Sequence, residues 1–416
     1  MATTAPEQGP LEEAAEAVRD DGLGAGVMIL FKTGRSRISS GELGALPVIV
    51  GLAVIWTYFQ SQDSHFLTPR NLSNLLLQIA VVGTIAIGLV LVLLLGEIDL
   101  SVGSVAGVCA ATLGVLVVSH NWPWWAAIVA MLLVGAAIGA IQGAWFAVVG
   151  VPSFIVTLAG LLGWQGLQLH VLGSTGTINV FESHISAIAT TFLPGFWGWA
   201  LAIGCAAAYA AAHVTEERRR RAAGLPSTQI AIVALRTLAT AALLLGAVAV
   251  LNRASGVPTA ALILLALVIL FSLITTKTKF GRYIYAVGGN AEAARRAGIN
   301  LRGIRICAFT LASTFAALGG LIQVSRGAAA STQTGGGTLL LEAIASAVIG
   351  GTSLFGGRGN VWSALLGALV IGSVSNGLDL IGQPADVKLM VEGGILLLAV
   401  TIDAASRRGR ASAGRV

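Results

Sequence analysis

The sequence predicts an all-α polytopic membrane protein, a helical bundle of about 10–12 transmembrane spans. Of its 416 residues, 56% are apolar even without the 53 glycines, and only 11% are charged. An ordinary soluble domain has about 25% charged residues. The apolar residues form runs of roughly 20, which is the length that crosses a bilayer, and they lack the alternation of barrel strands. This composition excludes most soluble enzymes and nucleic-acid readers, and we expect no nucleic acid among the partners.

Twelve apolar runs make up the expected bundle. The expected spans are 45–60, 75–95, 102–118, 124–149, 153–171, 196–212, 229–251, 258–275, 306–325, 339–354, 361–379 and 387–403. The runs at 102–118 and 339–354 are short and interrupted by glycine, which is typical of half-helices or re-entrant segments. The membrane domain therefore covers 45–405. A polar tail precedes it at 1–44 and a basic tail follows it at 406–416.

The cationic side chains predict the orientation of the bundle. If the N-terminus is cytoplasmic, twelve crossings return the C-terminus to the same side. The external segments then contain only Arg70, Arg253, Arg326 and Lys388. An excess of Lys and Arg on the cytoplasmic side is what the positive-inside rule requires, so we expect both termini to be cytoplasmic. The basic run 218–221 either orients its loop or binds anionic membrane lipid.

Glycines repeat at helical spacing within one of the expected spans. Gly135, Gly139 and Gly143 lie on one face of a helix. Small residues at this spacing let two membrane helices approach closely. We expect another helix to pack directly on this face.

No known catalytic motif occurs in the chain. GxxxxGK[ST], HExxH and GxSxG are all missing from the sequence, so we expect neither ATP hydrolysis through a phosphate loop nor a cofactor or metal site. The glycine-rich stretch Gly350–Asn360 invites interpretation as a phosphate-binding loop. Its place between two spans favours chain reversal or the end of a half-helix instead.

Two carboxylates lie between long apolar spans. Glu97 and Asp99 fall within the segment Gly96–Ser104. Burying a carboxylate between membrane helices is costly, and such residues are candidate functional sites. Two roles remain open here: Asp99 or Ser101 caps the helix that follows, or the acids line a translocation path. Glu342 and Glu392 also fall within spans, where they either face a water-filled cavity or pair across helices.

One short polar segment, 290–298, has residues at both ends that favour the start and the end of a helix. Asn290 can cap its N-terminus, Glu292 lies in the first turn, Arg295 and Arg296 lie in the last, and Gly298 suits the left-handed position after it. Two turns are marginally stable in water, so the helix needs a surface to dock on. That surface is the bilayer or a cytosolic partner. The helix has few large apolar residues, which favours the partner.

Three long motifs resemble those of a known family. Gly96–Ser104, Val151–Gly160 and Phe280–Asn290, in this order, resemble the membrane subunits of bacterial ABC sugar importers, the ribose, arabinose and xylose permease family. Ala345–Asn360 continues the resemblance, which covers residues 45–405.

Two features make the chain most similar to the D-xylose permeases of that family. Glu97 stands where ribose-type members have glycine, and the segment 196–251 looks like the extra helices of the xylose branch.

The resemblance implies a multi-pass subunit of a bacterial plasma membrane importer that is not itself an enzyme. Two copies of the permease, a homodimer, would line a path for a monosaccharide, D-xylose above all, which an extracytoplasmic sugar-binding protein delivers. A separate cytosolic ATPase chain would bind ATP and Mg and act on a coupling helix at 288–298.

The residues expected at the path or its gate are Glu97, Asp99, Ser101, Ser104, Ser153, Phe154, Thr352 and Ser353. Those expected to couple to the ATPase are Gly288, Gly289, Asn290, Glu292, Ala293, Arg295, Arg296 and Gly298. The alternatives are an ion-coupled secondary sugar transporter and an ABC permease for another sugar, such as ribose or arabinose.

Overall fold

The computed structural model describes residues 46–223 and 230–412, and this part of the chain is almost entirely helical. The expected cytoplasmic tail at 1–44 lies outside the described residues. Within them, eight helices are long and apolar enough to cross a membrane, and three shorter apolar helices accompany them. The predicted fold class is confirmed.

All twelve expected spans fall on helices. The helices are α3 (Leu46–Gln62), α4 (Pro69–Leu94), α5 (Val102–Gly114) continued by the π-helix η1 (Val115–Ser119), α6 (Trp124–Ala144) continued by η2 (Trp145–Val149), α7 (Ser153–Leu172), α8 (Ser183–Thr190), α9 (Gly195–Ala222), α10 (Ile230–Leu251), α11 (Thr259–Lys277), α12 (Lys279–Gly289), α13 (Ala291–Arg296), α14 (Leu301–Gly327), α15 (Leu339–Ile349), α16 (Trp362–Leu380) and α17 (Ala385–Ser412). The helix α17 continues through most of the segment expected as a basic tail at 406–416.

The two segments expected as half-helices differ in length. α15 has 11 residues, which at 1.5 Å per residue gives about 16 Å, roughly half the hydrocarbon thickness. It cannot cross a membrane alone, as expected. α5 has 13 residues, but η1 extends it to 18 residues that are long and apolar enough to cross. The expectation of a short segment is therefore wrong for 102–118.

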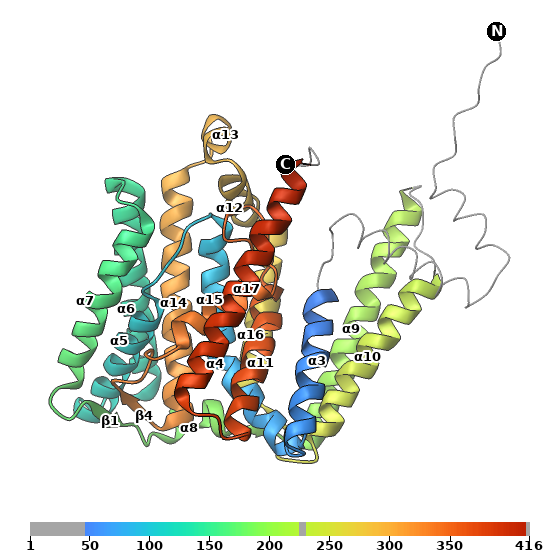
Figure 1. Ribbon diagram of the computed structural model, residues 1–416, viewed down its shortest axis with the longest axis horizontal. Helices are drawn as coiled ribbons and strands as arrows, with labels where there is room; N and C mark the ends of the chain where they lie inside the picture. The colour runs from blue at the N-terminus through green and yellow to red at the C-terminus, as the bar shows by residue number, and fades with distance from the viewer. Residues whose placement is uncertain (1–45, 224–229, 413–416) are drawn as a thin grey trace, which may run out of the picture. The chain divides into compact units, whose positions relative to one another are not determined.

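The chain divides into two compact units. The smaller contains α9 and α10 between Pro194 and Asn252, and the larger contains the remaining described helices. Within the smaller unit, α9 and α10 run side by side in opposite directions (Figure 1). This hairpin coincides with the segment that resembles the extra helices of the xylose branch.

The larger unit is built around α4 and α14. Most of α4 is buried inside the unit, and α14 packs against α4, α5 and α6. A Cβ atom added to Gly135 would lie 2.9 Å from Ser313 O of α14, and one added to Gly143 would lie 2.9 Å from Ile306 Cα. The glycine face of α6 therefore contacts another helix at backbone distance, as its spacing predicts.

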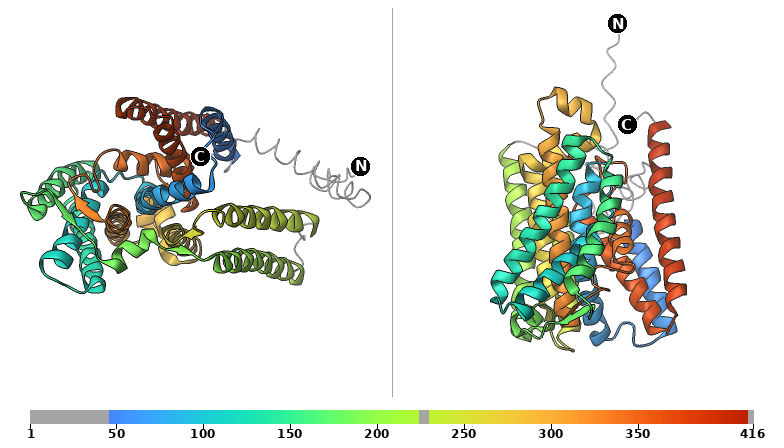
Figure 2. Two further views of the ribbon diagram at one scale, coloured as in Figure 1. Left: turned by 90° about the horizontal axis from the view of Figure 1, so that it is seen from below. Right: turned by 90° about the vertical axis from the view of Figure 1, so that its left-hand side faces the viewer.

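The two ends of the larger unit differ. α13 and the C-terminal end of α17 lie at one end, and α8, β1 and β4 lie at the other (Figures 1 and 2). There β1 (Thr177–Asn179) pairs antiparallel with β4 (Ala329–Ser331), and nearby β2 (Phe192–Leu193) pairs with β3 (Val257–Pro258).

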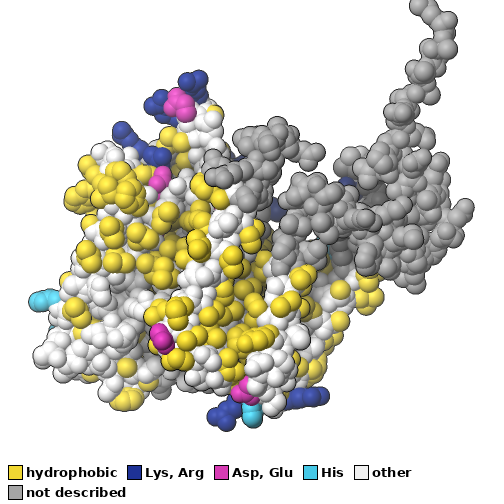
Figure 3. All heavy atoms as spheres, in the orientation of Figure 1, with side chains coloured by type: hydrophobic (Ala, Val, Ile, Leu, Met, Phe, Trp, Pro, Cys, Tyr) yellow, Lys and Arg dark blue, Asp and Glu magenta, His cyan; other side chains and the backbone are white. Residues whose placement is uncertain are grey.

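Hydrophobic side chains are exposed along the outward faces of the helices in the view of Figure 3. On α17, for example, Leu397, Leu398 and Ile402 are all more than half exposed. A soluble protein rarely exposes so continuous an apolar surface, and this one suits contact with lipid.

Candidate functional site

The loop that follows α4 begins with a helix-ending turn. Gly96 adopts a left-handed φ of 77°. Its N–H donates to Leu93 O at 2.8 Å, and the next N–H, of Glu97, donates to Val92 O at 3.3 Å. These two bonds satisfy carbonyls at the end of α4, and only glycine adopts such a φ without strain. The turn directs Gly96–Ser101, the polar loop, back into the bundle toward α5.

Glu97 links the polar loop to two other helices. Ser153 Oγ, at the start of α7, donates to Glu97 Oε2 at 2.6 Å, and Arg305 Nη2 of α14 lies 3.8 Å from Glu97 Oε1. The Arg305 guanidinium also stacks over the Phe146 ring at 4.7 Å. The hydrogen bond from Ser153 holds Glu97, and the cation–π contact with Phe146 holds Arg305 beside it. The structure thus brings Glu97 and Ser153 together, as their joint prediction requires.

Asp99 is completely buried, and its carboxyl group bonds to a residue close to it in the sequence. It accepts hydrogen bonds from Ser101 N at 2.8 Å and Ser101 Oγ at 2.6 Å. Neither side chain bonds an N–H in the first turn of α5, so the expectation that one of them caps this helix is wrong. Ser101 Oγ also lies 3.0 Å from Gln142 Oε1 of α6. One hydroxyl hydrogen cannot serve both acceptors, and the shorter of the two contacts is the one to Asp99 Oδ1.

The other candidates near the polar loop divide into buried and exposed side chains. Ser104 is buried, and its hydroxyl donates to Leu161 O of α7 at 2.8 Å. Phe154, by contrast, is 52% exposed on α7 and does not join the buried cluster. Asp99, Ser101 and Ser104 therefore hold the start of α5 against α6 and α7.

The loop after α15, Gly350–Asn360, is held mainly by backbone contacts. We call it the glycine loop. It opens with the same turn as the polar loop, because Gly351 has φ 105° and the N–H groups of Gly351 and Thr352 donate to Val348 O and Ala347 O. Thr352 is buried, and Ser353 Oγ donates to Asp403 Oδ2 of α17 at 3.1 Å. The Leu354 N–H reaches the same carboxylate oxygen at 3.3 Å.

The two loops meet at the end of α12. A Cβ atom on Gly288 would overlap Leu94 O and lie 2.7 Å from Gly357 N, and Gly357 N itself donates to Leu94 O at 2.8 Å. A Cβ atom on Gly356 would lie 2.7 Å from Gly96 N and 2.9 Å from Gly288 O. Tyr285 Oη donates to Gly359 O at 2.8 Å. We call this backbone contact of α12 with both loops the glycine junction.

Gly289 differs from its neighbour, since a Cβ atom there would have nothing within 4 Å. The two glycines were predicted together, and both backbones lie at the junction, since a Cβ atom on Gly357 would lie 2.9 Å from Gly289 Cα. Only at Gly288 is there no room for a side chain.

The helix α13 has the end contacts that its sequence predicts. Asn290 Oδ1 accepts from Ala293 N at 2.9 Å, and Gly298 has φ 81°. Arg295 and Arg296 both bond Glu292, at 3.0 and 3.1 Å. These hydrogen bonds hold the pKa of Glu292 below its usual value. Ala294 is buried and Ala291 is half-buried, whereas the other side chains of α13 are exposed. The helix itself lies at one end of the larger unit.

The comparisons with known proteins agree over nearly the whole chain. Residues 71–400 match a family described as the permease component of branched-chain amino acid transport systems. The xylose transport system permease protein of Escherichia coli strain K12 is 39% identical over 376 residues, which are 90% of this chain and 95% of that protein. The chain belongs to the ABC sugar permease family.

Two further relatives support the assignment. The xylose transport system permease protein of Haemophilus influenzae is 35% identical over 89% of this chain and 99% of its own length. The ribose import permease protein of Escherichia coli strain K12 is 30% identical over 89% of this chain and 97% of its own length. No solved structure matches the chain.

The permease is therefore a multi-pass membrane component of a bacterial ABC sugar importer, and it is not itself the ATPase of the system. Membership of the family implies an ATPase and a sugar-binding protein as partners. Among the residues that the structure describes, no group of His, Cys, Asp or Glu side chains could hold a metal ion.

Sequence reasoning missed three residues of the permease that complete the site. Arg305 and Gln142 contact the polar loop, and Asp403 contacts the glycine loop. Each lies 40 residues or more along the chain from the group it contacts. The only sequence indication was that Asp403 is an acidic residue at the end of an apolar run.

Proposed function

We propose that the permease carries D-xylose across the bacterial plasma membrane as the translocation subunit of an ATP-driven importer. The observation that carries the proposal is the 39% identity with a xylose transport system permease protein over 90% of the chain. Two further comparisons support the order of preference among sugars. A second xylose permease is 35% identical, and the ribose import permease is 30% identical.

The permease acts as a homodimer with a cytosolic ATPase and an extracytoplasmic binding protein. The ATPase binds ATP and Mg, and it docks on the segment 288–298. Exposure of α13 at one end of the larger unit supports this, since a two-turn helix needs a partner to be stable. We place both chain termini in the cytoplasm. The end of α17 lies at the same end as α13, which supports this for the C-terminus, and the excess of Lys and Arg expected inside supports it for both.

The membrane domain covers residues 45–405, between two cytoplasmic tails at 1–44 and 406–416. The path and its gate are formed by the polar loop and the glycine loop together with Ser104, Ser153 and Phe154. Movement of α13 reaches both loops through the glycine junction. The backbone distances at Gly288 and Gly356 support this route, because backbones in direct contact cannot move independently.

Reconstitution of the complete transporter tests the function. The permease, the ATPase and the binding protein encoded beside it are placed in proteoliposomes with labelled D-xylose outside. We expect uptake that needs ATP, survives a protonophore, and is competed more strongly by xylose than by ribose or arabinose.

Two outcomes would change the assignment. Uptake by the permease alone that a protonophore abolishes would make it an ion-coupled secondary transporter. ATP-driven uptake with a preference for ribose or arabinose would keep the class and replace the sugar.

A further inference from the structure

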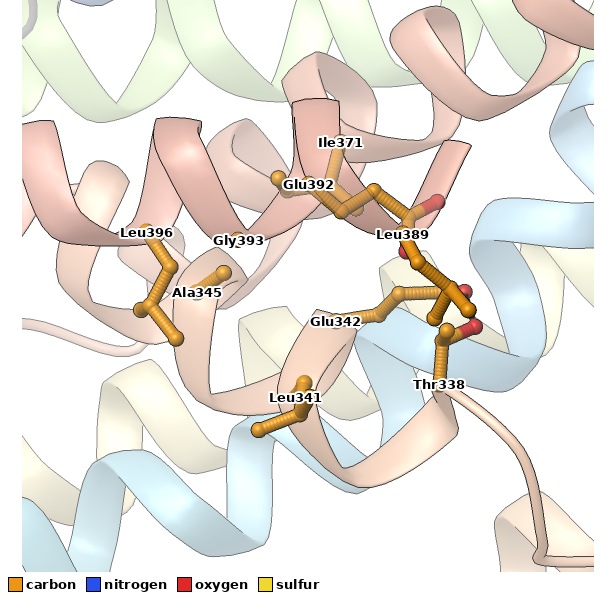
Figure 4. A pocket seen from close by; sticks show the side chains of 9 residues that line it. All are labelled: Thr338, Leu341, Glu342, Ala345, Ile371, Leu389, Glu392, Gly393 and Leu396. Carbon is orange, nitrogen blue, oxygen red and sulfur yellow. Dashed lines mark hydrogen bonds between the residues drawn. The ribbon is translucent and has the colours of Figure 1, made fainter. Parts of the chain in front are cut away.

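A small pocket with two carboxyl groups lies between α15, α16 and α17 (Figure 4). Its volume is about 20 Å³, which is room for a single water-sized group and far too little for a sugar. Apolar side chains form most of its lining: Leu341, Ala345, Ile371, Leu389 and Leu396. Glu342, Glu392 and Thr338 are its polar members, and both carboxyl groups point to the same side of the pocket in Figure 4.

The two glutamates differ in their hydrogen bonds. Thr338 Oγ1 donates a short hydrogen bond to Glu342 Oε1, within the first turn of α15. Glu392 is only 9% exposed, and its Oε2 atom has no hydrogen-bond partner among the described residues. Ser375 of α16 is the hydroxyl that lies close to this carboxyl group. Burying an ionised carboxylate with one oxygen unpaired is costly, whereas a protonated carboxyl group carries no charge to bury.

The cations nearby are already paired with another acid. Lys388, on α17, forms an ion pair with Asp379 of α16, and Arg326 of α14 also faces Asp379. Lys388 also lies near Glu392, four residues along α17, but its ion pair is with Asp379. Among the described residues, Glu342 and Glu392 line one pocket and neither forms an ion pair. Two ionised carboxylates in a narrow apolar pocket repel strongly, and such pairs hold one proton between them.

We propose that Glu342 and Glu392 share one exchangeable proton, carried by Glu392, which holds α17 against the half-helix α15. The proton comes from water and returns to water, so that Glu392 alternates between the acid and the carboxylate. Glu342 remains the ionised partner, because Thr338 donates to it.

The proton completes the attachment of α15 to α17. At the other end of α15, Asp403 of α17 already holds the glycine loop through Ser353 and Leu354. Loss of the proton places two like charges across the remaining contact between the helices. The first turns of α17 then separate from α15 while the Asp403 contact persists.

Infrared spectroscopy of the full-length permease in nanodiscs tests the proposal. We expect the carbonyl stretch of a protonated carboxyl group at neutral pH, its loss as pH rises, and its absence in Glu392→Gln. Glu216→Gln, at an exposed acid of α9, is the matched control and leaves the band intact. Thermal stability should fall with rising pH in the wild type and stay level in Glu392→Gln, which keeps a neutral group of the same shape.

Thr338→Val provides a second variant that keeps both carboxyl groups. Without the Thr338 hydrogen bond the ionised form of Glu342 is less favourable, so the band should persist to higher pH than in the wild type. The proposal is overturned if the wild type has no protonated carboxyl band at neutral pH, or if Glu392→Gln leaves that band unchanged. It is also overturned if Na⁺ at constant pH removes the band and stabilises the protein, since the pocket would then bind a metal cation.

Discussion

The polar loop and the glycine loop open with the same helix-ending turn, yet they are held by different forces. Side chains anchor the polar loop, through Glu97 to Ser153 and Arg305 and through buried Asp99. Backbone contacts hold most of the glycine loop, where atoms of Gly356 and Gly357 approach two other segments. A loop held by side chains should respond to changes of charge, and one held by backbone contacts should respond to any added atom.

The two loops meet at one residue of α12. Gly288 lies against Leu94, which precedes the polar loop, and against Gly357 in the glycine loop. Whatever moves α12 therefore acts on both loops at once, and substitutions at this point should have the largest effect.

Gly288→Ala should cost the most activity. The added methyl overlaps Leu94 O, and forced overpacking of this kind costs about 1–3 kcal/mol. We expect a fall in transport by the complete system of about tenfold or more, since each 1.4 kcal/mol is a factor of ten. Uptake of labelled sugar and ATPase activity are measured together in proteoliposomes.

Gly289→Ala is the matched control, because its methyl meets nothing within 4 Å. Transport by this variant should match the wild type. If the two variants lost transport equally, the glycine junction would not transmit movement from α12 to the polar loop and the glycine loop.

Within the glycine loop, Gly356→Ala should be the more damaging of two substitutions at glycines with positive φ. Gly351 and Gly356 have φ of 105° and 81°, so both substitutions carry backbone strain of about 1–2 kcal/mol. Only at Gly356 does the new methyl also press on Gly96 N and Gly288 O. The unfolding temperature and the rate of uptake should both fall further for Gly356→Ala than for Gly351→Ala. The reverse order would show that the positive φ, and not the contacts of the added methyl group, determines how sensitive the loop is.

Local chemistry explains what the sequence could predict. The cap at Asn290 and the left-handed Gly298 follow from rules that involve only neighbouring residues, and both are present. Twelve apolar runs mark twelve helices for the same reason, since the length of each run is read directly along the chain.

Long-range contacts explain what the sequence could not predict. Arg305 and Asp403 contact loops far away in the chain, and neither stands out from other charged residues near span ends. Gly288 and Gly289 are identical in type and adjacent, yet only at Gly288 would a Cβ atom overlap another backbone. The capping role expected for Ser101 failed because Ser101 has helical dihedral angles, φ −93° and ψ −11°, where a capping residue is usually extended.

In the polar loop, Asp99→Ala should destabilise the permease by about 1–3 kcal/mol, the cost of leaving buried donors unpaired. The donors are the N–H and the hydroxyl of Ser101. Asp99→Asn keeps an oxygen to accept these hydrogen bonds and should lose less. Unfolding in detergent is measured for both variants, and equal losses would indicate that the charge of Asp99, and not its shape, holds the loop.

The smallest effect is expected at α13, which lies beyond both loops. Asn290→Ala removes the hydrogen bond to Ala293 N, and loss of such a cap costs about 1 kcal/mol. Asn290→Asp keeps the acceptor and should behave as the wild type. Binding of the ATPase should weaken in the alanine variant while the thermal stability of the permease alone changes little, because the side chains of α13 are mostly exposed.

The dependence of this binding on pH tests the same helix. Arg295 and Arg296 lower the pKa of Glu292, so its contribution is complete above the ordinary carboxyl value and is lost as pH falls through the lowered one. Binding of the ATPase should thus be level around neutral pH and weaken only in acid, and Glu292→Gln should remove that acid dependence. Binding could instead change near neutral pH, with Glu392→Gln removing the change and Glu292→Gln leaving it. ATPase binding would then depend on the pocket between α15 and α17, which lies at the end of α15 opposite the glycine loop.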